Sequence, residues 1–445
     1  MLGEQELRRV ADEVLAASRA DETEVLIVAQ ESQLTRFANS SIHQHVAESN
    51  SSVRVRALVG QRSGVASTND LTPAALRTAA TRATEIARLQ PANPEQLPLA
   101  TPQPLPRVDA FREATASCTP EVRARAVGLI CRLAREAGLA ASGAFSTAQQ
   151  ALVLANSRGL FAYHPSTAAN LTTVIMGSDS SGYASRADLD VSSIDAEGAG
   201  REAVNKAVRS RAPRDIEPGI YPVLLEGYAV GEMLQYMAYL GFSALAVQEG
   251  RSFLGGHLGE SIVDPAISIW DDGLDPTGFP LPFDFEGMPK RRVDIIRWGV
   301  AAGVVYDRQT AAREGKESTG HGLPAPNTVG PMALNLFMAP GQASREELLR
   351  TLGRGLLVTR FHYVNPVHPL RAVLTGMTRD GTFLIEHGEA VAPVKNLRFT
   401  QGAVEALNHV LGVGARTVLL NTDLGGVRVP DLALGEFNFS GRTEF

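Results

Sequence analysis

Cysteine, positive net charge and long hydrophobic runs are the scarce features of this 445-residue chain. Its two cysteines, Cys118 and Cys131, form no Cys-x-x-Cys pair, so a disulfide framework is not expected and a reducing compartment is. The formal net charge is −6, without the basic balance of a nucleic-acid-binding domain. No apolar run reaches the ~20 residues of a transmembrane helix, and the segment 1–6 lacks the features of a signal peptide. We therefore expect a cytoplasmic protein that binds neither nucleic acid nor a membrane.

The composition is that of an ordinary globular protein, with 44% hydrophobic and 20% charged residues. A chain this long exceeds one compact core, so we expect two domains. Pro213, Pro218 and Gly219 interrupt regular structure between two regions of different character. We place the domain boundary there and predict an N-terminal domain over 1–212 and a C-terminal domain over 213–445.

The N-terminal domain reads as a layered α+β domain with an antiparallel sheet. Apolar residues at helical spacing predict helices, and alternating segments predict strands. Asn69 and Asp70 are candidate caps for the helix that follows them, and the prolines between 91 and 106 predict an extended connection. The predicted helices cover 4–19, 73–89, a segment from Pro120 and 195–210; the predicted strands cover 24–30, 33–39, 42–48, 52–59, about 140–155 and about 160–178.

The C-terminal domain reads as β-rich, with a barrel-like arrangement. A buried strand over 220–225 leads into a helix over 228–240, and short strands with glycine turns follow. Asp380-Gly381 and His387-Gly388 are predicted to be turns that separate three short strands near 372–378, 382–386 and 390–394. Ser344 and Glu347 fit a capping box ahead of a short helix. The predicted fold class is therefore α+β.

Several segments along the chain carry a recognisable pattern: Leu34–His43, Val53–Arg56 with Gly64–Asn69, Asn156–Gly159, Asp271–Gly273, Gly355–Arg360, Ile385–Glu389 and Val429–Leu432. In this order and spacing they resemble the TldD/PmbA family, whose PmbA branch is also called TldE. The resemblance covers nearly the whole length, although no single segment is specific to the family.

The resemblance implies a relative of cytoplasmic metal-dependent peptidases. In the family's best-known form, a TldD subunit carries His-Glu-x-x-x-His and a C-terminal cysteine ligand, whereas its TldE partner carries no metal. Here the Ala-Val-Gly core of that motif survives as 229–231. Gly227 and Glu232 occupy the two histidine positions, Tyr228 occupies the glutamate position, and no cysteine follows Cys131. The resemblance thus implies a TldE/PmbA-like subunit with no metal, cofactor or catalytic residue of its own, and a zinc-type metal only in a partner.

Eight residues are candidates for lining a peptide cleft: Glu226, Tyr228, Glu232, Arg251, His257, His321, Arg360 and His362. The carboxylates could form an acid/base pair, and the arginines could hold a peptide carboxylate or backbone through forked hydrogen bonds. Each residue also has a structural interpretation, as a helix cap, a core aromatic, a solvent-facing loop residue or an ordinary ion pair. The sequence leaves both interpretations open.

Three functions remain open at this level. The leading one is a subunit that pairs with a TldD-type His-Glu-x-x-x-His chain and shapes a cleft for a peptide or an unfolded polypeptide. The second is a stand-alone hydrolase whose site is rebuilt from His257, His321 or His362 with a glutamate. The third is a non-catalytic homodimeric binding protein, in which a second copy replaces the catalytic partner.

Overall fold

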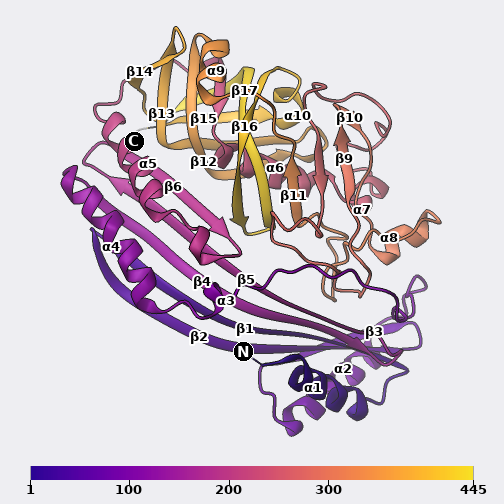
Figure 1. Cartoon of the computed structure of the whole chain (residues 1–445). Helices are drawn as coiled ribbons and strands as arrows, with labels where there is room; N and C mark the ends of the chain where they lie inside the picture. The colour runs from indigo at the N-terminus through magenta and orange to yellow at the C-terminus, as the bar shows by residue number, and fades with distance from the viewer. Residues whose placement is uncertain (1, 444–445) are drawn as a thin grey trace.

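The computed structural model describes residues 2–443 and has an α+β fold built on two large sheets (Figure 1). A six-stranded antiparallel sheet belongs to the N-terminal part, and a larger mixed sheet belongs to the C-terminal part. The first sheet arches along one side of the molecule, and the second lies against its inner face. This arrangement confirms the predicted fold class and the predicted antiparallel N-terminal sheet.

The N-terminal sheet has the strand order β3-β2-β1-β4-β5-β6, so β3 and β6 are its two edges. Its strands are β1 (Glu22–Ala38), β2 (Ser41–Val59), β3 (Arg62–Thr68), β4 (Ala140–Asn156), β5 (Phe161–Met176) and β6 (Ser181–Asp188). Every neighbouring pair is antiparallel, from Glu22 opposite Leu58 to Met176 opposite Ser181. The edge strand β6 faces the C-terminal part and contacts β13 and β16.

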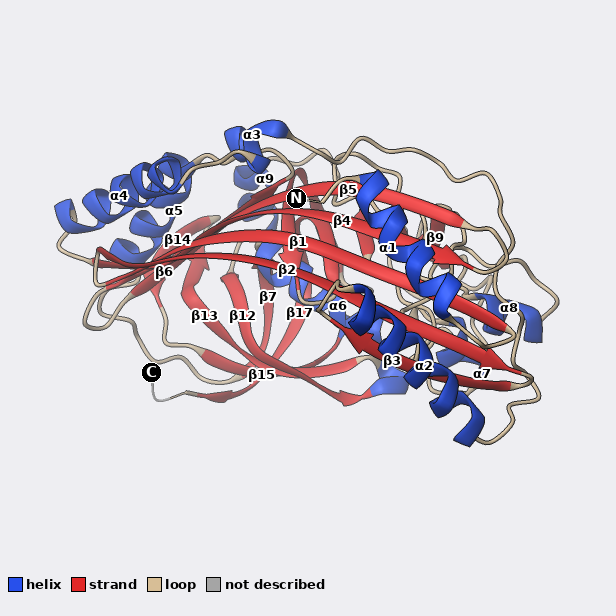
Figure 2. Cartoon of the chain, turned by 90° about the horizontal axis from the view of Figure 1, so that it is seen from below, coloured by secondary structure: helices blue, strands red, loops and turns tan. Residues whose placement is uncertain are grey.

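Two helix pairs cover the outer face of this sheet, one at each end (Figure 2). One pair is α1 (Glu4–Ala17) with α2 (Pro73–Leu89), and the other is α4 (Pro120–Glu136) with α5 (Ala196–Arg209). The short helix α3 (Glu113–Ala116) precedes α4 and belongs to neither pair. Around α1 and α2 the core includes Val25, Ile27 and Val153; around α4 and α5 it includes Phe37 and Phe145. These odd-numbered positions share one face of β1 and β4 because side chains alternate along a strand.

Two predictions for this part were wrong in detail. The segments 24–30 and 33–39 form one strand, as do 42–48 and 52–59. The polar residues between them stay in the ladder, since Glu31 pairs with Ser49 and no turn-forming dipeptide intervenes. The cap of α2 is Thr72, whose side chain accepts from the Ala75 amide, and not Asn69 or Asp70.

The C-terminal sheet closes on itself. Its main path is β10-β9-β8-β11-β17-β15-β13-β12-β7, and β17 also pairs with β7, so five strands form a closed ring. The ring bears out the barrel-like prediction. The strands are β7 (Gly219–Leu225), β8 (Ile269–Asp271), β9 (Val293–Arg297), β10 (Val300–Ala301), β11 (Asn335–Met338), β12 (Gly355–His368), β13 (Val373–Glu386), β14 (Glu389–Pro393), β15 (Leu397–Gly402), β16 (Val410–Thr422) and β17 (Gly425–Arg442).

The helix α6 (Gly227–Gly241) is the hydrophobic centre of this part. Twelve of its fifteen residues are buried, and they pack with β12, β16 and β17. The remaining helices are short: α7 (Ala244–Gln248), α8 (Arg308–Arg313), α9 (Arg345–Leu352) and α10 (Ala403–Ala406). The predicted capping box of Ser344 and Glu347 begins α9.

The predicted turn at Asp380-Gly381 is wrong: both residues lie inside the continuous strand β13. They form a bulge opposite Thr359, since Val358 pairs with Thr382 while Arg360 pairs with Arg379. Asp380 has φ +57° and Gly381 φ +124°. An Asp-Gly pair suits these angles in a bulge as well as in a turn. The sequence alone therefore could not tell the two apart.

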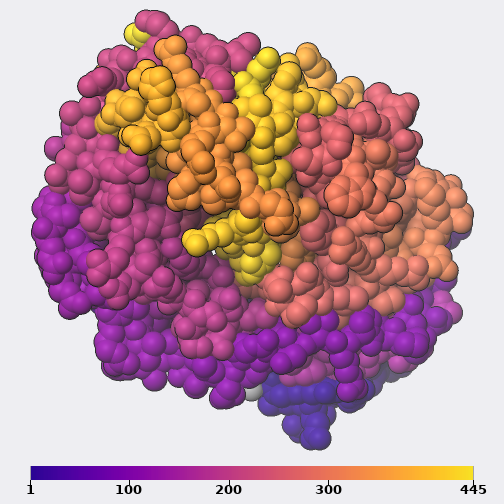
Figure 3. Space-filling view, turned by 45° about the horizontal axis from the view of Figure 1, so that its top comes forward, coloured from indigo at the N-terminus to yellow at the C-terminus, as the bar shows by residue number. Residues whose placement is uncertain are grey.

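A second apolar layer joins the two parts of the chain. Leu26, Leu152 and Leu154 point to the inner face of the N-terminal sheet and pack against Phe283 of the C-terminal part. In the space-filling view the N-terminal residues, purple and magenta, meet the orange and yellow C-terminal residues along a continuous seam (Figure 3). None of the helices described here is long and apolar enough to cross a membrane.

Candidate functional site

The junction between β7 and α6 lies where the two sheets meet. The strand ends at Leu225, Glu226 is the N-cap of α6, and Gly227 is its first residue. The Glu226 amide donates to the Val358 carbonyl over 3.0 Å, and the Gly227 amide donates to Asp431 Oδ1 over 2.7 Å. The carboxylate of Asp431 thereby replaces the missing side-chain cap at a helix terminus that favours negative charge.

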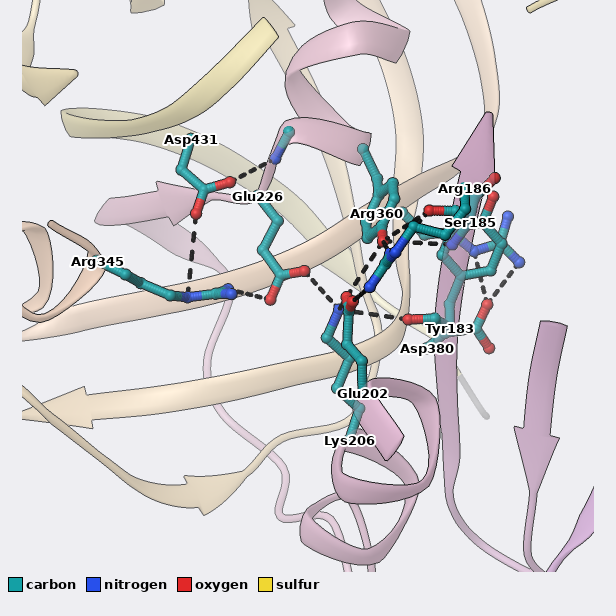
Figure 4. Close-up of polar contacts among 12 residues, drawn as sticks. Tyr183, Ser185, Arg186, Glu202, Lys206, Glu226, Arg345, Arg360, Asp380 and Asp431 are labelled. Carbon is teal, nitrogen blue, oxygen red and sulfur yellow. Dashed lines mark hydrogen bonds and ion pairs between the residues drawn. The ribbon is translucent and has the colours of Figure 1, made fainter. Parts of the chain in front are cut away.

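Glu226 is the centre of a buried ion-pair network (Figure 4). Its Oε2 lies 2.6 Å from Lys206 Nζ, and its Oε1 contacts the Arg345 guanidinium. Lys206, on α5, also lies 2.6 Å from Glu202 Oε1. The network therefore connects α5 of the N-terminal part with the barrel, and each of its carboxylates has a cationic partner.

Tyr228 takes part in the same network through its hydroxyl. Arg186 Nη1 and the Ser185 amide donate to this oxygen over 3.0 Å and 3.3 Å, and the hydroxyl donates to Glu202 Oε1 over 3.2 Å. The ring packs edge-on against Tyr183, with centroids 5.0 Å apart. Burial raises the pKa of Tyr228 well above its usual range. The side chain is thus a neutral, fully bonded wall of the site.

Gly227 and Gly231 allow α6 to lie directly against β16. A Cβ at position 227 would come within 2.5 Å of Val418 Cγ2, and one at position 231 within 2.4 Å of Leu420 Cδ1. Real Cβ atoms do not approach other carbons this closely, so a side chain at position 227 or 231 requires Val418 or Leu420 to shift. Val418 therefore occupies the space that a side chain at position 227, the first histidine position of the family motif, would need.

Two cavities lie on either side of Tyr228. The larger, of about 690 Å³, is here called the Arg345 cavity; it is bounded by β6, Glu202, Glu226, the start of α9, and β16. The smaller, of about 250 Å³, is here called the Glu232 cavity; it is bounded by Tyr183, Glu232, Gln235, Tyr236, Arg360, and Asp423 among others. Tyr228 and Ser185 line both cavities.

The charges of the Glu232 cavity are arranged differently from those around Glu226. Arg360 Nε donates to Asp380 Oδ2 over 2.6 Å, and its guanidinium lies 4.4 Å from the centroid of the Tyr183 ring. Burial raises the pKa of Glu232, against a smaller lowering by Arg360. Four of the predicted cleft residues, Glu226, Tyr228, Glu232 and Arg360, are therefore brought together at the walls of these two cavities.

The other four candidates lie outside both cavities. Arg251 pairs with Glu249 at the surface, and the exposed His257 pairs with Glu260. His362 is half-buried beside Tyr363, and burial and nearby Arg379 lower its pKa. Within residues 2–443, no three His, Cys, Asp or Glu side chains are grouped so that they could hold a metal.

His321 is fully buried rather than facing a cleft. Its Nε2 lies 2.7 Å from Asp271 Oδ1, and Lys290 Nζ lies 3.5 Å from the same oxygen. Burial and Lys290 lower the pKa of the imidazole. The arrangement ties the end of β8 to two loops, and we interpret it as a structural ion pair.

The positively charged residues of the site were not predicted from the sequence. Arg186 lies on β6, Lys206 on α5 and Arg345 on α9. Lys206 and Arg345 both bind Glu226, and Arg345 is 119 residues away from it in the sequence. Their residue types and spacing carry no motif. The capping box at Ser344 was the one available signal, because it fixes where α9 begins and hence where Arg345 lies.

Comparisons with known proteins find matches along most of the chain. Three family models match: PmbA/TldA metallopeptidase domain 1 over residues 23–87, the central domain over 120–211 and the C-terminal domain over 218–441. The last alone covers half of the chain. The metalloprotease PmbA of Escherichia coli O157:H7 is 24% identical over 396 residues, 84% of this chain and 83% of that protein.

Other relatives match over shorter stretches. The metalloprotease TldD homolog of Haemophilus influenzae is 24% identical over 262 residues, 54% of this chain and 52% of that protein. The chain spans about half the length of this relative and of the next two metalloproteases, from Methanothermobacter thermautotrophicus and Buchnera aphidicola.

Solved structures share the fold. The crystal structure of TldE from Thermococcus kodakarensis superposes with a TM-score of 0.90 at 20% identity, covering 98% of this chain and all of that one. A Thermotoga maritima protein, described as a candidate modulator of a DNA gyrase, gives 0.87 at 19% identity, again over 98% of this chain and all of that one. From the three matched models together, this chain belongs to the PmbA/TldD metallopeptidase family.

Proposed function

We propose that this chain is the TldE/PmbA-type subunit of a cytoplasmic peptidase and carries no metal of its own. It would pair with a TldD-type chain that supplies His-Glu-x-x-x-His and the zinc-type metal. Its contribution would be to form part of the cleft that holds a peptide or an unfolded polypeptide. No proton transfer or bond cleavage is assigned to its own residues.

One observation carries the proposal: the structure of the β7–α6 junction is intact while its residues do not fit the family's metal site. Gly227 has no donor atom, and its Cβ space is taken by Val418. The Tyr228 hydroxyl is bonded to Arg186, Ser185 and Glu202. Zinc sites need three ligands of the His, Cys or carboxylate type. Of the three motif positions, only Glu232 could supply one.

The edge strand β6 supports a role in holding an extended chain. Ser185, Arg186, Ala187 and Asp188 line the Arg345 cavity from the free edge of the six-stranded sheet. The Ser185 amide and carbonyl on this edge are already bonded to Tyr228 and Arg186. The backbone open to a further strand therefore lies beyond Ser185, and a strand edge reads little of the sequence that pairs with it. This chemistry suits a subunit that holds unfolded polypeptides of many sequences.

The proposal is tested by purifying this chain alone, without chelator, and together with a TldD-type chain encoded by the same genome. We expect substoichiometric zinc, iron and manganese in the chain alone by elemental mass spectrometry. We also expect co-elution of the two chains on size exclusion, and chelator-sensitive peptide cleavage only in the mixture. A TldD-type variant whose motif glutamate is replaced by glutamine is the matched control, and its mixture should be inactive.

Two results would overturn the proposal in favour of the alternatives. One tightly held metal per chain with chelator-sensitive cleavage by the chain alone would indicate a stand-alone hydrolase. In that case alanine variants of His257, His321 and His362 would identify the rebuilt site. A stable self-dimer that binds no TldD-type chain and cleaves nothing would instead indicate a homodimeric binding protein.

A further inference from the structure

The Glu232 cavity has more hydrogen-bond acceptors and negative charge than its own residues satisfy. Glu232, Asp423 and Arg360 are the charged residues that line it. The charge of Arg360 is matched by Asp380 behind it. Within residues 2–443, neither Glu232 nor Asp423 forms an ion pair. Asp423 is exposed to solvent, whereas Glu232 is partly buried, so the negative charge at the cavity wall that lacks an ion-pair partner is that of Glu232.

Gln235 gives a second and independent sign that a ligand is missing. Its side chain is 9% exposed and lines the cavity, yet its Oε1 has no hydrogen-bond partner among the described residues. Buried amides in folded proteins are nearly always bonded, because an unbonded one loses its hydration without replacement. Its Oε1 is closed off from solvent, so a group in the cavity could restore this bond only if the amide turns toward it.

The acceptors come from one face of α6. Glu232, Gln235 and Tyr236 are spaced i, i+3 and i+4, which places them side by side on a helix surface. The Tyr236 hydroxyl donates to the Val364 carbonyl over 2.6 Å, so its oxygen keeps lone pairs for a further donor. A carboxylate, an amide and a phenol thus line one wall of the cavity.

We infer that the Glu232 cavity binds a protonated primary amine, in which an ammonium group donates to Glu232 and Tyr236, and to Gln235 once its amide turns toward the cavity. An ammonium has three donors and no acceptor, which matches this set of groups. An anion would meet Glu232 and Asp423 unfavourably, since the one arginine present is already paired. The amine would come from a lysine side chain or from the free amino end of a peptide.

The titration of Glu232 supports this inference. Burial raises the pKa of its carboxyl group, and a bound ammonium would lower it again, because an opposite charge favours the ionised form. Binding therefore releases a proton when the pH lies near the raised pKa. Affinity should fall as the pH is lowered through that pKa, at a pH above the usual 4.5 of a glutamate.

The experiment is a calorimetric titration of the full-length chain alone, at pH 7, with three tripeptides of alanine and lysine. One has a free amino end and no lysine, one is blocked at both ends with a central lysine, and one is blocked at both ends with no lysine. We expect one of the two amine-bearing peptides to bind and the blocked trialanine not to. Which of the two binds identifies the source of the amine.

Variants assign the binding to this cavity. Glu232→Gln keeps the shape of the side chain and should weaken binding about ten- to a hundredfold, as expected for the loss of a charge-assisted hydrogen bond. Gln235→Leu should weaken it less, and thermal melts of both variants should show that they remain folded. Glu85→Gln, at an exposed position of α2, is the control and should bind like the wild type.

Equal binding of all three peptides, no binding of either amine, or wild-type affinity in a folded Glu232→Gln protein would overturn the inference. The peptide character of the ligand rests on the proposed function, whereas the recognition of an amine does not. The titration uses no catalytic partner. A failure to pair with a TldD-type chain therefore leaves this result unaffected, and a failure to bind amines leaves the pairing experiment unaffected.

Discussion

The Arg345 cavity and the Glu232 cavity share the wall formed by Tyr228, but the buried charged groups beside them differ in whether they are paired. In the network around Glu226, at the wall of the first, Glu202, Glu226 and Asp431 face Lys206, Arg186 and Arg345, so three anions meet three cations. The more open part of this cavity is also lined by Asp188, Glu346, Glu347, Arg416 and Arg428, which lie outside that network. Around the second, a carboxylate and an amide are left without partners among the described residues.

The difference indicates that the charges around Glu226 stabilise the fold, whereas the groups around Glu232 are suited to binding. Paired charges recover part of their lost hydration from one another and hold two elements in a fixed geometry. Unpaired acceptors cost stability in the free protein and gain it back only with a ligand. The network around Glu226 therefore joins α5 to the barrel, whereas the groups around Glu232 are available to bind a ligand.

The largest expected effect comes from unbalancing the paired network. Lys206→Met removes the cation shared by Glu202 and Glu226 and should lower the free energy of unfolding by about 3–5 kcal/mol, because the buried Glu226 and the partly buried Glu202 lose a partner. Chemical denaturation would measure the change. In the control, Glu4→Gln at the exposed Arg8–Glu4 pair should cost less than ~1 kcal/mol. A loss of similar size in both variants would show that the network contributes no more than a surface pair.

A second carboxylate, on the seam between the two parts, sharpens the comparison through pH. Glu24 on β1 is 5% exposed, and burial raises its pKa from 4.5 to about 7, although Arg56 lies 3.8 Å away. The folded chain thus favours its protonated form. Its contribution to stability is full below pH ~4.5 and is lost as the pH rises through about 7.

Glu24→Gln should therefore reduce the fall in the free energy of unfolding between pH 4.5 and pH 7 by up to about 3 kcal/mol. Denaturation series at several pH values would measure it. Glu6→Gln, at an exposed position of α1, is the matched control. A Glu24→Gln protein with the wild-type pH profile would show that Arg56 keeps this carboxylate ionised.

The close contact of α6 with β16 should be sensitive to one methyl group. Gly227→Ala should cost about 1–3 kcal/mol through its clash with Val418, and Val418→Ala should relieve the clash in the double variant. Gly128→Ala in α4, where the added carbon meets nothing within 4 Å, should instead stabilise by up to ~1 kcal/mol. If the two glycine substitutions have the same effect, Val418 does not fill the motif position.

The smallest expected effect is a gain in stability within the unpaired cavity. Gln235→Leu replaces an unbonded buried amide by an apolar group of similar size and should raise the free energy of unfolding by about 1 kcal/mol. In the control, Gln248→Leu should lower it by a similar amount, because Gln248 donates to the Thr310 carbonyl over 2.8 Å. A loss of stability in Gln235→Leu would contradict the description of Gln235 as unsatisfied.

Local patterns in the sequence predicted the secondary structure well where a single segment contains the whole signal. The helix over 73–89, the capping box at Ser344 and the His387-Gly388 turn between β13 and β14 all appear as expected. The predictions failed where neighbours decide. Polar residues in the middle of β1 and β2 stay in strand because both sides of β1 are paired. Asp380-Gly381 becomes a bulge because β12 continues opposite it.

The sequence by itself determined the fold class and the resemblance to the family. It also showed that Gly227, Tyr228 and Glu232 stand at the motif positions, because residue identities and local periodicity are properties of single segments. Only the tertiary structure decided which candidates meet, since Lys206, Arg345 and Asp431 reach Glu226 and the start of α6 from distant elements. It also decided that His321 is buried with Asp271, while Gln235 Oε1 has no partner among the residues that the structure describes. Burial and pairing depend on what the rest of the chain places around a side chain, and no local pattern contains that information.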